Sequence, residues 1–584
     1  NYGSIIGGDD SIDVENLSAG GLIINRGTLT GGDDAFDADG DFEGRFENYS
    51  IMRGGSDGVD IDGIFSGEMF NCGIIEGGQF GFLVSAGATG TGTFHNHGGR
   101  VQGGFGAISM GNGNGTVLLS GPSHIIGSIN GGAGTGDVLR FQDMRGVSAE
   151  KQAELLALAT SDPNSGSITL FGESISWLNV EDIQADGSTL ESYESLFSGT
   201  GLSGYGNSLD NLNGLDDSLR EFLKILNDVS IDTLSEAASN SSGQTLRNAM
   251  SDLRRNRDTN FYHLFSNQFS SLRGDVAGGG SNLAVRSQGF LSQEVEIGSS
   301  VRVVEPEVST WVTSYVGSSS QDGNGVRAAA DYDESTILFG RGTEWGEGGW
   351  LGWFGGYSRT EGRVDGFGSY LENDGGWFGL NAQLRRGDAF ATLVGGIGYQ
   401  DIKTNRIDFL GNVHEGNADA FGAFFYSQVG RDFFFGEEGN GRWSPYAGFT
   451  YGGDAISAYS ENGPAASALR FQDDTETVFQ TVLGVSVTGY EETRKGWFRP
   501  RADLAWWHSY GDDSFGAGLA NTNLLNNFSV VNPGANENRG VFQVGIEFGL
   551  DSLEDWTFEA GYFGVLGESD YNSNGATLGA RVEF

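Results

Sequence analysis

The sequence is poor in cysteine, proline and positive charge. Its 584 residues include one cysteine, seven prolines, and 33 lysines and arginines against 78 acidic residues, for a formal net charge of −45. A single thiol excludes a fold held together by internal disulfides. The acidic excess excludes a nucleic-acid partner, because phosphate groups would be repelled over most of the surface. No apolar run approaches the roughly 18 residues that a membrane-spanning helix needs, so a membrane could be crossed only by a β-barrel.

A repeated segment, asparagine followed by a Gly-Gly pair, fills the first hundred residues. The repeats begin at Asn1, Asn25, Asn48, Asn71 and Asn96, at intervals of 24, 23, 23 and 25 residues. Apolar residues keep fixed places in each repeat with the spacing of two that is typical of strands. Short strands in a 23-residue repeat predict a parallel β-helix. We expect each Asn to occupy a turn with positive φ and to stack on the next Asn amide, and we expect rungs upstream of residue 1.

Acidic residues also recur at fixed places in three of these rungs. The three columns are Asp10, Asp34 and Asp57; Asp13, Asp37 and Asp60; and Glu15, Asp39 and Asp62. Stacked carboxylates about 4.8 Å apart repel one another unless a cation neutralises them. The columns therefore indicate either calcium, bound between rungs as a cofactor, or a solvated acidic face. On the fourth rung these positions become Phe80, Leu83 and Ser85, which limits any calcium site to three rungs.

Later segments predict an end to the solenoid and then helices. A helix is expected over 148–159 with Ser148 as N-cap, and the alternation over 165–184 predicts a hairpin-like closing rung. Helical patterns follow at 216–229, 231–239 and 244–272. The last would be about 43 Å long. It carries Arg247, Arg254, Arg255 and Arg257 without a dominant apolar stripe, which favours exposure to solvent or a place inside a polar channel.

The region after residue 307 alternates apolar and polar residues throughout. Twelve strands are expected, beginning near residues 309, 332, 349, 372, 389, 417, 443, 475, 496, 538, 555 and 575. Ten of the eleven tryptophans lie after residue 310, as the aromatic girdles of a transmembrane barrel require. The terminal segment TLGARVEF places Thr577, Gly579, Val582 and Phe584 at the spacing of an outer-membrane insertion signal.

Rung repeats, a long helix and a terminal barrel together resemble the classical, monomeric autotransporters of type V secretion. The resemblance implies a mainly β chain: a right-handed parallel β-helix passenger at 1–188, a linker at 189–308 with a pore helix at 244–272, and a twelve-stranded antiparallel outer-membrane barrel at 309–584. It also implies a Gram-negative outer membrane, a passenger on the cell surface, and partners in membrane lipid, the barrel-assembly machinery and periplasmic chaperones. The pore-helix arginines are expected to meet acidic side chains of the barrel lumen.

The role of the exposed part is left open between two classes. Self-cleavage at an Asn-Asn pair, known in the family, is not expected, because the pore helix has no such pair. A non-enzymatic adhesive or structural passenger is favoured, since residues 1–188 contain one lysine, six arginines and three histidines. His95 and His97 share a strand face, but without a third ligand we expect them to have a structural role. The alternatives are a carbohydrate-active β-helix enzyme and a porin-like channel plugged by the helix.

Overall fold

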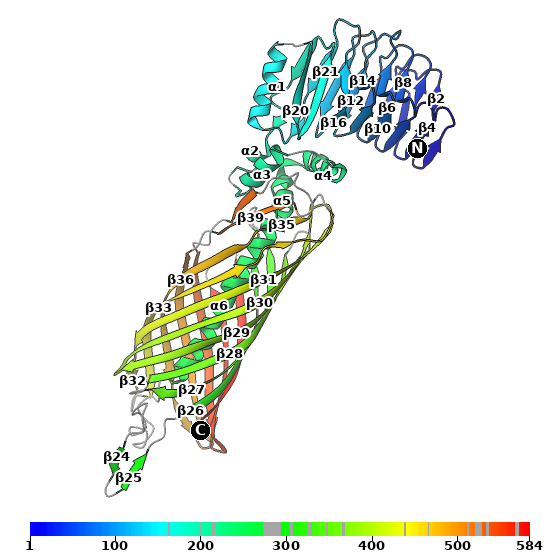
Figure 1. Cartoon of the computed structure of the whole chain (residues 1–584). Helices are drawn as coiled ribbons and strands as arrows, with labels where there is room; N and C mark the ends of the chain where they lie inside the picture. Colours follow the sequence, from blue (N-terminus) through cyan, green and yellow to red (C-terminus); the bar gives the residue numbers. More distant parts are fainter. Residues whose placement is uncertain are drawn as a thin grey trace. The chain divides into compact units, whose positions relative to one another are not determined.

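A computed structural model (Figure 1) forms two compact units. The first is Asn1–Ser235 with Pro464–Ser467 and Gly518–Ser529, and the second is Glu236–Gly463, Ala468–Ala517 and Val530–Phe584. The structure describes residues 1–161, 164–198, 200–212, 216–272, 294–297, 300–303, 308–323, 329–345, 349–364, 368–436, 440–464, 467–510, 513–519, 528–532, 537–566 and 571–583.

The amino-terminal unit is a parallel β-solenoid made of three sheets. One sheet is β1 (Ser4–Ile6), β4 (Thr28–Gly31), β7 (Ile51–Gly54), β10 (Ile74–Gly77), β13 (Arg100–Gly103) and β16 (His124–Ile126). The second is β2 (Asp13–Val14), β5 (Asp37–Ala38), β8 (Asp57–Ile61), β11 (Phe80–Val84), β14 (Gly106–Ser109), β17 (Ser128–Asn130), β21 (Glu173–Leu178) and β20 (Ser165–Leu170). The third is β22 (Asp182–Ala185), β18 (Val138–Phe141), β15 (Thr116–Ser120), β12 (Thr93–His97), β9 (Glu68–Asn71), β6 (Arg45–Asn48) and β3 (Leu22–Asn25). The predicted solenoid is confirmed.

Asn25, Asn48 and Asn71 end strands of the third sheet and pair in register, and Asn71 also pairs with Asn96. Asn25 Nδ2 donates to Asn48 Oδ1 at 2.9 Å, and Asn48 Nδ2 donates to Asn71 Oδ1 at 2.8 Å, so the predicted amide ladder is present. The predicted positive φ is wrong: outside glycine, the described residues with positive φ are Asp143, Phe171 and Asn179. The asparagine oxygen accepts the N–H two residues later, which makes the corner an Asx turn without left-handed backbone.

The solenoid core consists of apolar columns. Leu29, Met52 and Ile75 lie in register and are fully buried. The edge-to-face contact of Phe36 with Phe46, at 4.9 Å between ring centroids, links two of the sheets. Near the carboxyl end, the antiparallel pair β20–β21 buries Trp177 and forms the predicted closing hairpin. The helix α1 (Ala149–Ser161) begins after Ser148, whose Oγ accepts the Lys151 N–H at 3.3 Å.

Helices follow the solenoid. They are α2 (Tyr193–Leu196), α3 (Ser203–Asp210), α4 (Asp217–Asp228), α5 (Ile231–Ser241) and α6 (Gln244–Leu272). The short strands β19 (Met144–Arg145) and β23 (Leu190–Glu191) pair in parallel nearby. Asp216 caps α4 by accepting the Leu219 N–H at 2.7 Å. None of the described helices combines the length and apolar character that crossing a membrane would require.

The carboxyl-terminal unit is an antiparallel barrel of twelve long strands, closed by the pairing of its first and last strands. Its wall strands are β26 (Val308–Gln321), β27 (Ala330–Trp345), β28 (Gly349–Val364), β29 (Ser369–Arg386), β30 (Ala389–Ile407), β31 (Val413–Arg431), β33 (Gly441–Ile456), β36 (Asp474–Gly489), β38 (Gly496–Tyr510), β41 (Glu537–Leu550), β42 (Leu553–Leu566) and β43 (Tyr571–Glu583). Outward positions such as Val316, Phe378 and Leu380 are large, apolar and exposed, as a lipid-facing wall requires.

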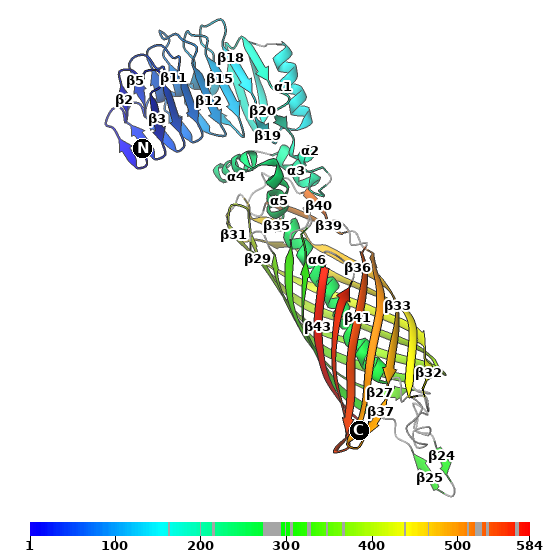
Figure 2. The ribbon, with the colours of Figure 1, turned by 180° about the vertical axis from the view of Figure 1, so that it is seen from behind.

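Shorter strands extend the barrel wall or lie outside it. They are β24 (Glu294–Ile297), β25 (Ser300–Val303), β32 (Phe433–Phe435), β34 (Tyr459–Ser460), β35 (Leu469–Phe471), β37 (Glu491–Thr493), β39 (Asp513–Leu519) and β40 (Phe528–Asn532). The views from both sides show α6 running along the inside of the barrel (Figure 2). Of the two alternatives that the sequence left open for this helix, exposure to solvent or a place inside a channel, the structure shows the second.

Candidate functional site

The site with the densest set of buried charges is the contact between α6 and the barrel lumen. Arg257 is 5% exposed, and its guanidinium lies 3.0 Å from an Asp454 oxygen and 3.0 Å from Gln400 Oε1. It also contacts Asp258 at 2.9 Å and lies over the Trp377 ring at 4.7 Å. A buried guanidinium with two carboxylates and an aromatic face is held in one position.

Two further arginines of α6 meet acidic residues of β36. Arg254 lies 3.0 Å from Glu476, while Arg247 hydrogen-bonds Asp474 and lies 3.5 Å from Glu476. The predicted pairing of pore-helix arginines with lumen carboxylates is therefore present for Arg247, Arg254 and Arg257. The side chain of Arg255 lies outside the described part of the chain. Asp258 and Glu334, which the sequence analysis did not single out, belong to the same contact, since Asn260 hydrogen-bonds Glu334.

The second half of α6 is aromatic, a feature that the sequence analysis missed. Phe261 packs edge-on against Trp377 at 5.2 Å and contacts Phe424 at 4.9 Å. Phe265 lies 4.7 Å from Phe354. These side chains belong to one buried cluster inside the barrel. The lumen is therefore polar along the first turns of α6 and aromatic beside Phe261 and Phe265, not a uniformly polar channel.

The helix fills the lumen closely. Three gaps between α6 and the wall, beside Phe261, Arg254 and Gln268, each hold about 10 Å³. A space of this size admits about one water molecule. With α6 in this position, these gaps are too small for a solute to pass.

The predicted insertion signal lies on β43. Thr577 faces the lumen and is buried, while Gly579 stands opposite Thr313 on β26. A methyl group added at Gly579 would collide with a Glu559 oxygen, so glycine makes room for this carboxyl group. Val582 pairs with Thr310, and Phe584 lies outside the described residues.

The acidic rungs form a second constellation, in the solenoid. Strand pairing places Asp13 beside Asp37 and Asp37 beside Asp60, as predicted, and the Asp57 N–H donates to Asp34 Oδ1 at 2.7 Å. Three groups bring carboxylate oxygens within 4.8 Å of one another: Asp9, Asp10 and Asp33; Asp13, Asp37 and Asp39; and Asp34, Asp57 and Asp60. The second and third groups each combine two predicted columns, whereas the first joins Asp10 to two residues outside the columns. Asp9 and Asp33 were missed, and Glu15 and Asp62 are in none of the three groups.

Burial and mutual repulsion change the acidity of these groups. The pKa of Asp34 is raised to about 7, first by burial and then by the charges of neighbouring aspartates. The pKa of Asp60 is raised to about 7 and that of Asp37 to about 6 for the same reasons. Carboxyl groups in this state hold a proton near neutral pH or favour a bound cation.

The histidine pair of the solenoid surrounds one hydroxyl group. His95 Nε2 and His97 Nδ1 each lie 2.8 Å from Ser120 Oγ, and His97 Nε2 lies 3.1 Å from Asp228 of α4. Burial lowers the pKa of His95 to about 4, so its ring is neutral at physiological pH. Ser120 is only 1% exposed. The hydroxyl is thus enclosed in a structural network.

Comparison with known proteins identifies the barrel. Residues 310–562 match the family model described as the autotransporter beta-domain. The barrel is an autotransporter β-domain. The molecule is accordingly an outer-membrane autotransporter barrel with a surface-exposed solenoid passenger, and α6 is the helix that occupies the barrel lumen.

Solved autotransporter domains are among the similar structures. The translocator domain of autotransporter NalP from Neisseria meningitidis is 15% identical, with 47% of this chain and 88% of that chain covered and a TM-score of 0.38. The beta domain of the Bordetella autotransporter Brka is 17% identical, with 47% and 99% covered and a TM-score of 0.39. The transport unit of AIDA-I from Escherichia coli is 16% identical, with 52% and 96% covered and a TM-score of 0.36. No curated protein matches the chain.

Proposed function

We propose that the barrel carries the acidic solenoid to the cell surface and keeps it anchored there, as a non-enzymatic adhesive or structural passenger. The observation that supports this most directly is the fixed position of α6. Arg257 is buried between Asp258 and Asp454, and Arg254 is paired with Glu476. A connecting helix held by buried ion pairs keeps the passenger tethered, because pulling it out would leave charges without partners.

Folding of the solenoid supplies the direction of transport in this proposal. Its apolar columns are fully buried, and the closing hairpin buries Trp177 and Ile175. A segment that folds only after leaving the barrel buries this surface outside the cell, which disfavours its return. Delivery of the barrel to the membrane would depend on periplasmic chaperones and the barrel-assembly machinery.

The passenger is proposed to remain uncleaved. The α6 sequence contains Asn248, Asn256 and Asn260 but no adjacent pair of asparagines. The Asn260 amide hydrogen-bonds Glu334 inside the lumen. A single uncleaved chain that joins passenger and barrel is therefore expected in the outer membrane, in place of two fragments.

The proposal also includes a cofactor: the acidic rungs bind calcium. It is supported by the three carboxylate groups and by Asp37 Oδ1, a buried oxygen that accepts no hydrogen bond from the described residues. Hard carboxylate oxygens are the ligands that calcium prefers. Millimolar calcium at about 100 times its dissociation constant would stabilise the passenger by about 2.7 kcal/mol over EDTA. Identical resistance of the passenger to protease in both buffers would remove calcium from the proposal.

The test of the transport proposal is protease shaving of intact cells followed by mass spectrometry. Peptides from 1 to about 230 should be released, while peptides from 308–583 should stay in the membrane fraction. Untreated cells should show one full-length band whose migration depends on heating, as folded barrels do. Recovery of the whole chain in the soluble fraction, or of a separate passenger fragment before protease is added, would contradict transport or anchoring respectively.

A further inference from the structure

A groove of about 700 Å³ lies on the barrel wall where β29, β30, β31 and β33 meet near their short turns. Strand pairing puts Leu384, Ala391, Val429 and Ala447 in one row across the four strands. Leu384 and Val429 are exposed, and the two alanines beside Val429 leave space between larger side chains. The groove is therefore an apolar depression in the lipid-facing wall.

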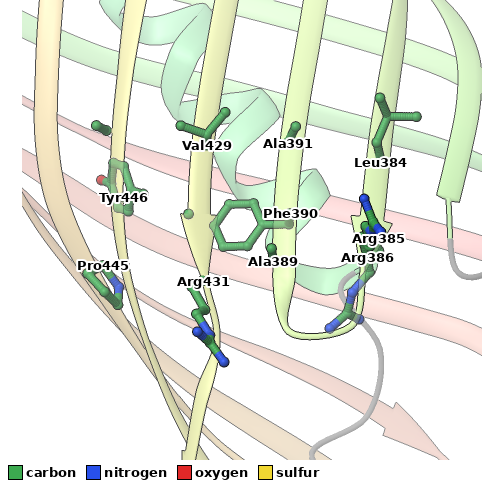
Figure 3. Close-up of a pocket in the computed structure, with 12 residues that line it drawn as sticks. Leu384, Arg385, Arg386, Ala389, Phe390, Ala391, Val429, Arg431, Pro445 and Tyr446 are labelled. Carbon is green, nitrogen blue, oxygen red and sulfur yellow. The ribbon is translucent and has the colours of Figure 1, made fainter.

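The next row toward the turn is basic. Arg386 and Arg431 are both paired in register with Ala389, one on each side of it. One strand, β30, lies between them, so their backbones are two strand spacings or about 10 Å apart, a distance that two flexible arginine side chains can close around one phosphate. Figure 3 shows the arginines at one end of the groove, with Leu384, Ala391 and Val429 farther along it.

The acidic groups that face these arginines leave this basic end available. Asp432 is buried and pairs with Arg385 at 3.2 Å. Asp388 contacts Arg431 at 3.4 Å, but both side chains are at least half exposed. An exposed pair of this kind contributes little free energy, so a phosphate can replace the Asp388 carboxylate as partner of Arg431. In a chain with a net charge of −45, an apolar groove that ends in two arginines is selective for an anion.

The position of the groove relative to the membrane also fits a lipid headgroup. The Arg431 guanidinium lies 5.5 Å from the centre of the Phe433 ring, which stacks on Trp443 at 4.7 Å. Tryptophans at a barrel wall mark the level of the headgroups. The chain enters the barrel at the opposite end, where Arg406 bonds the Asn240 carbonyl, so with a surface passenger the short turns face the periplasm.

We propose that this groove retains one anionic phospholipid of the periplasmic leaflet. Its phosphate lies between Arg386 and Arg431, and an acyl chain follows Ala391 and Ala447. The same barrel provides an internal comparison, because a second groove of about 620 Å³ at the same end is bordered by Glu491 and Glu492. The two grooves are similar in size and differ in the sign of the charge at their rims.

The test is native mass spectrometry of the full chain in detergent with phosphatidylglycerol or phosphatidylcholine of identical acyl chains. One phosphatidylglycerol should be retained, with weaker retention of phosphatidylcholine. Replacing both arginines (Arg386→Gln with Arg431→Gln) should weaken phosphatidylglycerol binding about 30-fold, since each arginine accounts for about fivefold. Phosphatidylcholine binding should change little. A bulky side chain in the groove (Ala447→Phe) should weaken binding of both lipids.

The matched control removes two positive charges elsewhere on the outer wall. Arg359→Gln with Lys403→Gln changes the net charge equally, and both wild-type residues are exposed beside Glu372. Heat-modifiable migration verifies folding of every variant. Equal binding of the two lipids to the wild-type chain, or equal loss in both double variants, would overturn the proposal. A dimer that the arginine substitutions dissociate would also overturn it, by assigning the groove to a second copy of the chain.

Discussion

In the barrel, Asp454 and Glu476 lie beside arginines of α6, whereas in the solenoid Asp34 and Asp60 lie beside further aspartates. Both regions place carboxyl groups out of solvent. The barrel compensates for their burial with guanidinium groups that belong to the chain. The solenoid instead depends on protons or on a cation from solution, because its carboxyl groups have raised pKa values.

The difference corresponds to what each region has to do. A helix that must stay inside a lumen is specified by charges with unique partners, since breaking a buried pair is costly. In the transport that we propose, the passenger crosses as an unfolded chain and meets the ions and pH of the exterior only after export. Stacked carboxyl groups can make its stability depend on that exterior. The barrel should thus be insensitive to pH near neutrality and the solenoid sensitive.

The largest effect is expected from removing a lumen guanidinium. Arg257→Met leaves Asp454 and Asp258 without their cation and should destabilise the barrel by about 3–5 kcal/mol. The loss should appear as a lower temperature at which the heat-modifiable form unfolds on gels. Arg359→Met, which removes an exposed arginine paired with Glu361, should lower this temperature far less. Equal effects of the two substitutions would show that the lumen pairs do not hold the helix.

A smaller effect is expected in the solenoid, where an uncharged ladder replaces the ion pairs. Asn48→Ala breaks the amide bonds to Asn25 and Asn71 in a fully buried column, at a cost of about 3 kcal/mol. Protease resistance of the passenger should fall while barrel migration stays unchanged. Asn16→Ala is the control, because Asn16 accepts one exposed hydrogen bond from the Asp41 N–H and should contribute less than about 1 kcal/mol. Comparable losses from both would rule out the ladder as a main support.

In the acidic column, removing a charge should stabilise the passenger, whereas the two substitutions above destabilise the chain. The folded pKa of Asp34 is about 7, above the value of about 3.9 in an unfolded chain, so the folded state holds the extra proton between these values. Stability is then greatest below pH 4 and is lost as the pH rises through 7. In EDTA at pH 8, Asp34→Asn should stabilise the passenger by about 2 kcal/mol. Asp13→Asn, at an exposed position, should change protease resistance less; a destabilising Asp34→Asn would contradict the account.

The smallest effect is expected at the exposed ion pairs of the solenoid. Arg45 contacts Glu47 at 2.7 Å and also reaches Glu68, but its side chain is 42% exposed. Arg45→Gln should therefore change stability by less than about 1 kcal/mol, and less still in high salt. The change in stability is measured by comparing the protease resistance of the wild-type and Arg45→Gln passengers at low and at high salt. A loss as large as that of Arg257→Met would mean that burial does not explain the difference between the regions.

Much of this architecture could be predicted from the sequence because it is periodic. The Asn interval fixed the rung register, alternation located the twelve strands, and α6 begins and ends at Gln244 and Leu272 as expected. Hydrophobic periodicity could not reveal the aromatic half of α6, because a helix surrounded by a wall on all sides has no single apolar face. Phe261 and Phe265 therefore do not form part of an apolar stripe that the helical periodicity of the sequence could reveal.

The carboxylate partners of the α6 arginines could not be identified from the sequence, because only the closed barrel brings them to the helix. Asp454 and Glu476 stand on strands about 200 residues from α6, and only strand register and tilt bring them to the helix. Two of the carboxylate groups of the solenoid likewise combine neighbouring columns, because Asp60 comes within 4.8 Å of Asp34 and Asp57, and Asp39 within 4.8 Å of Asp13 and Asp37. The positive φ expected at the Asn positions was wrong because an Asx turn satisfies the same corner. The role of the passenger stays a prediction.

The most direct test of the difference between the regions is one pH series on the full chain in EDTA, from pH 5 to pH 8, with two readouts. Protease resistance reports the passenger, and heat-modifiable migration reports the barrel. The account predicts that passenger stability falls as the pH rises and recovers with millimolar calcium, while the barrel transition stays constant. A passenger unaffected by pH, or a barrel that shifts by the same amount, would contradict it.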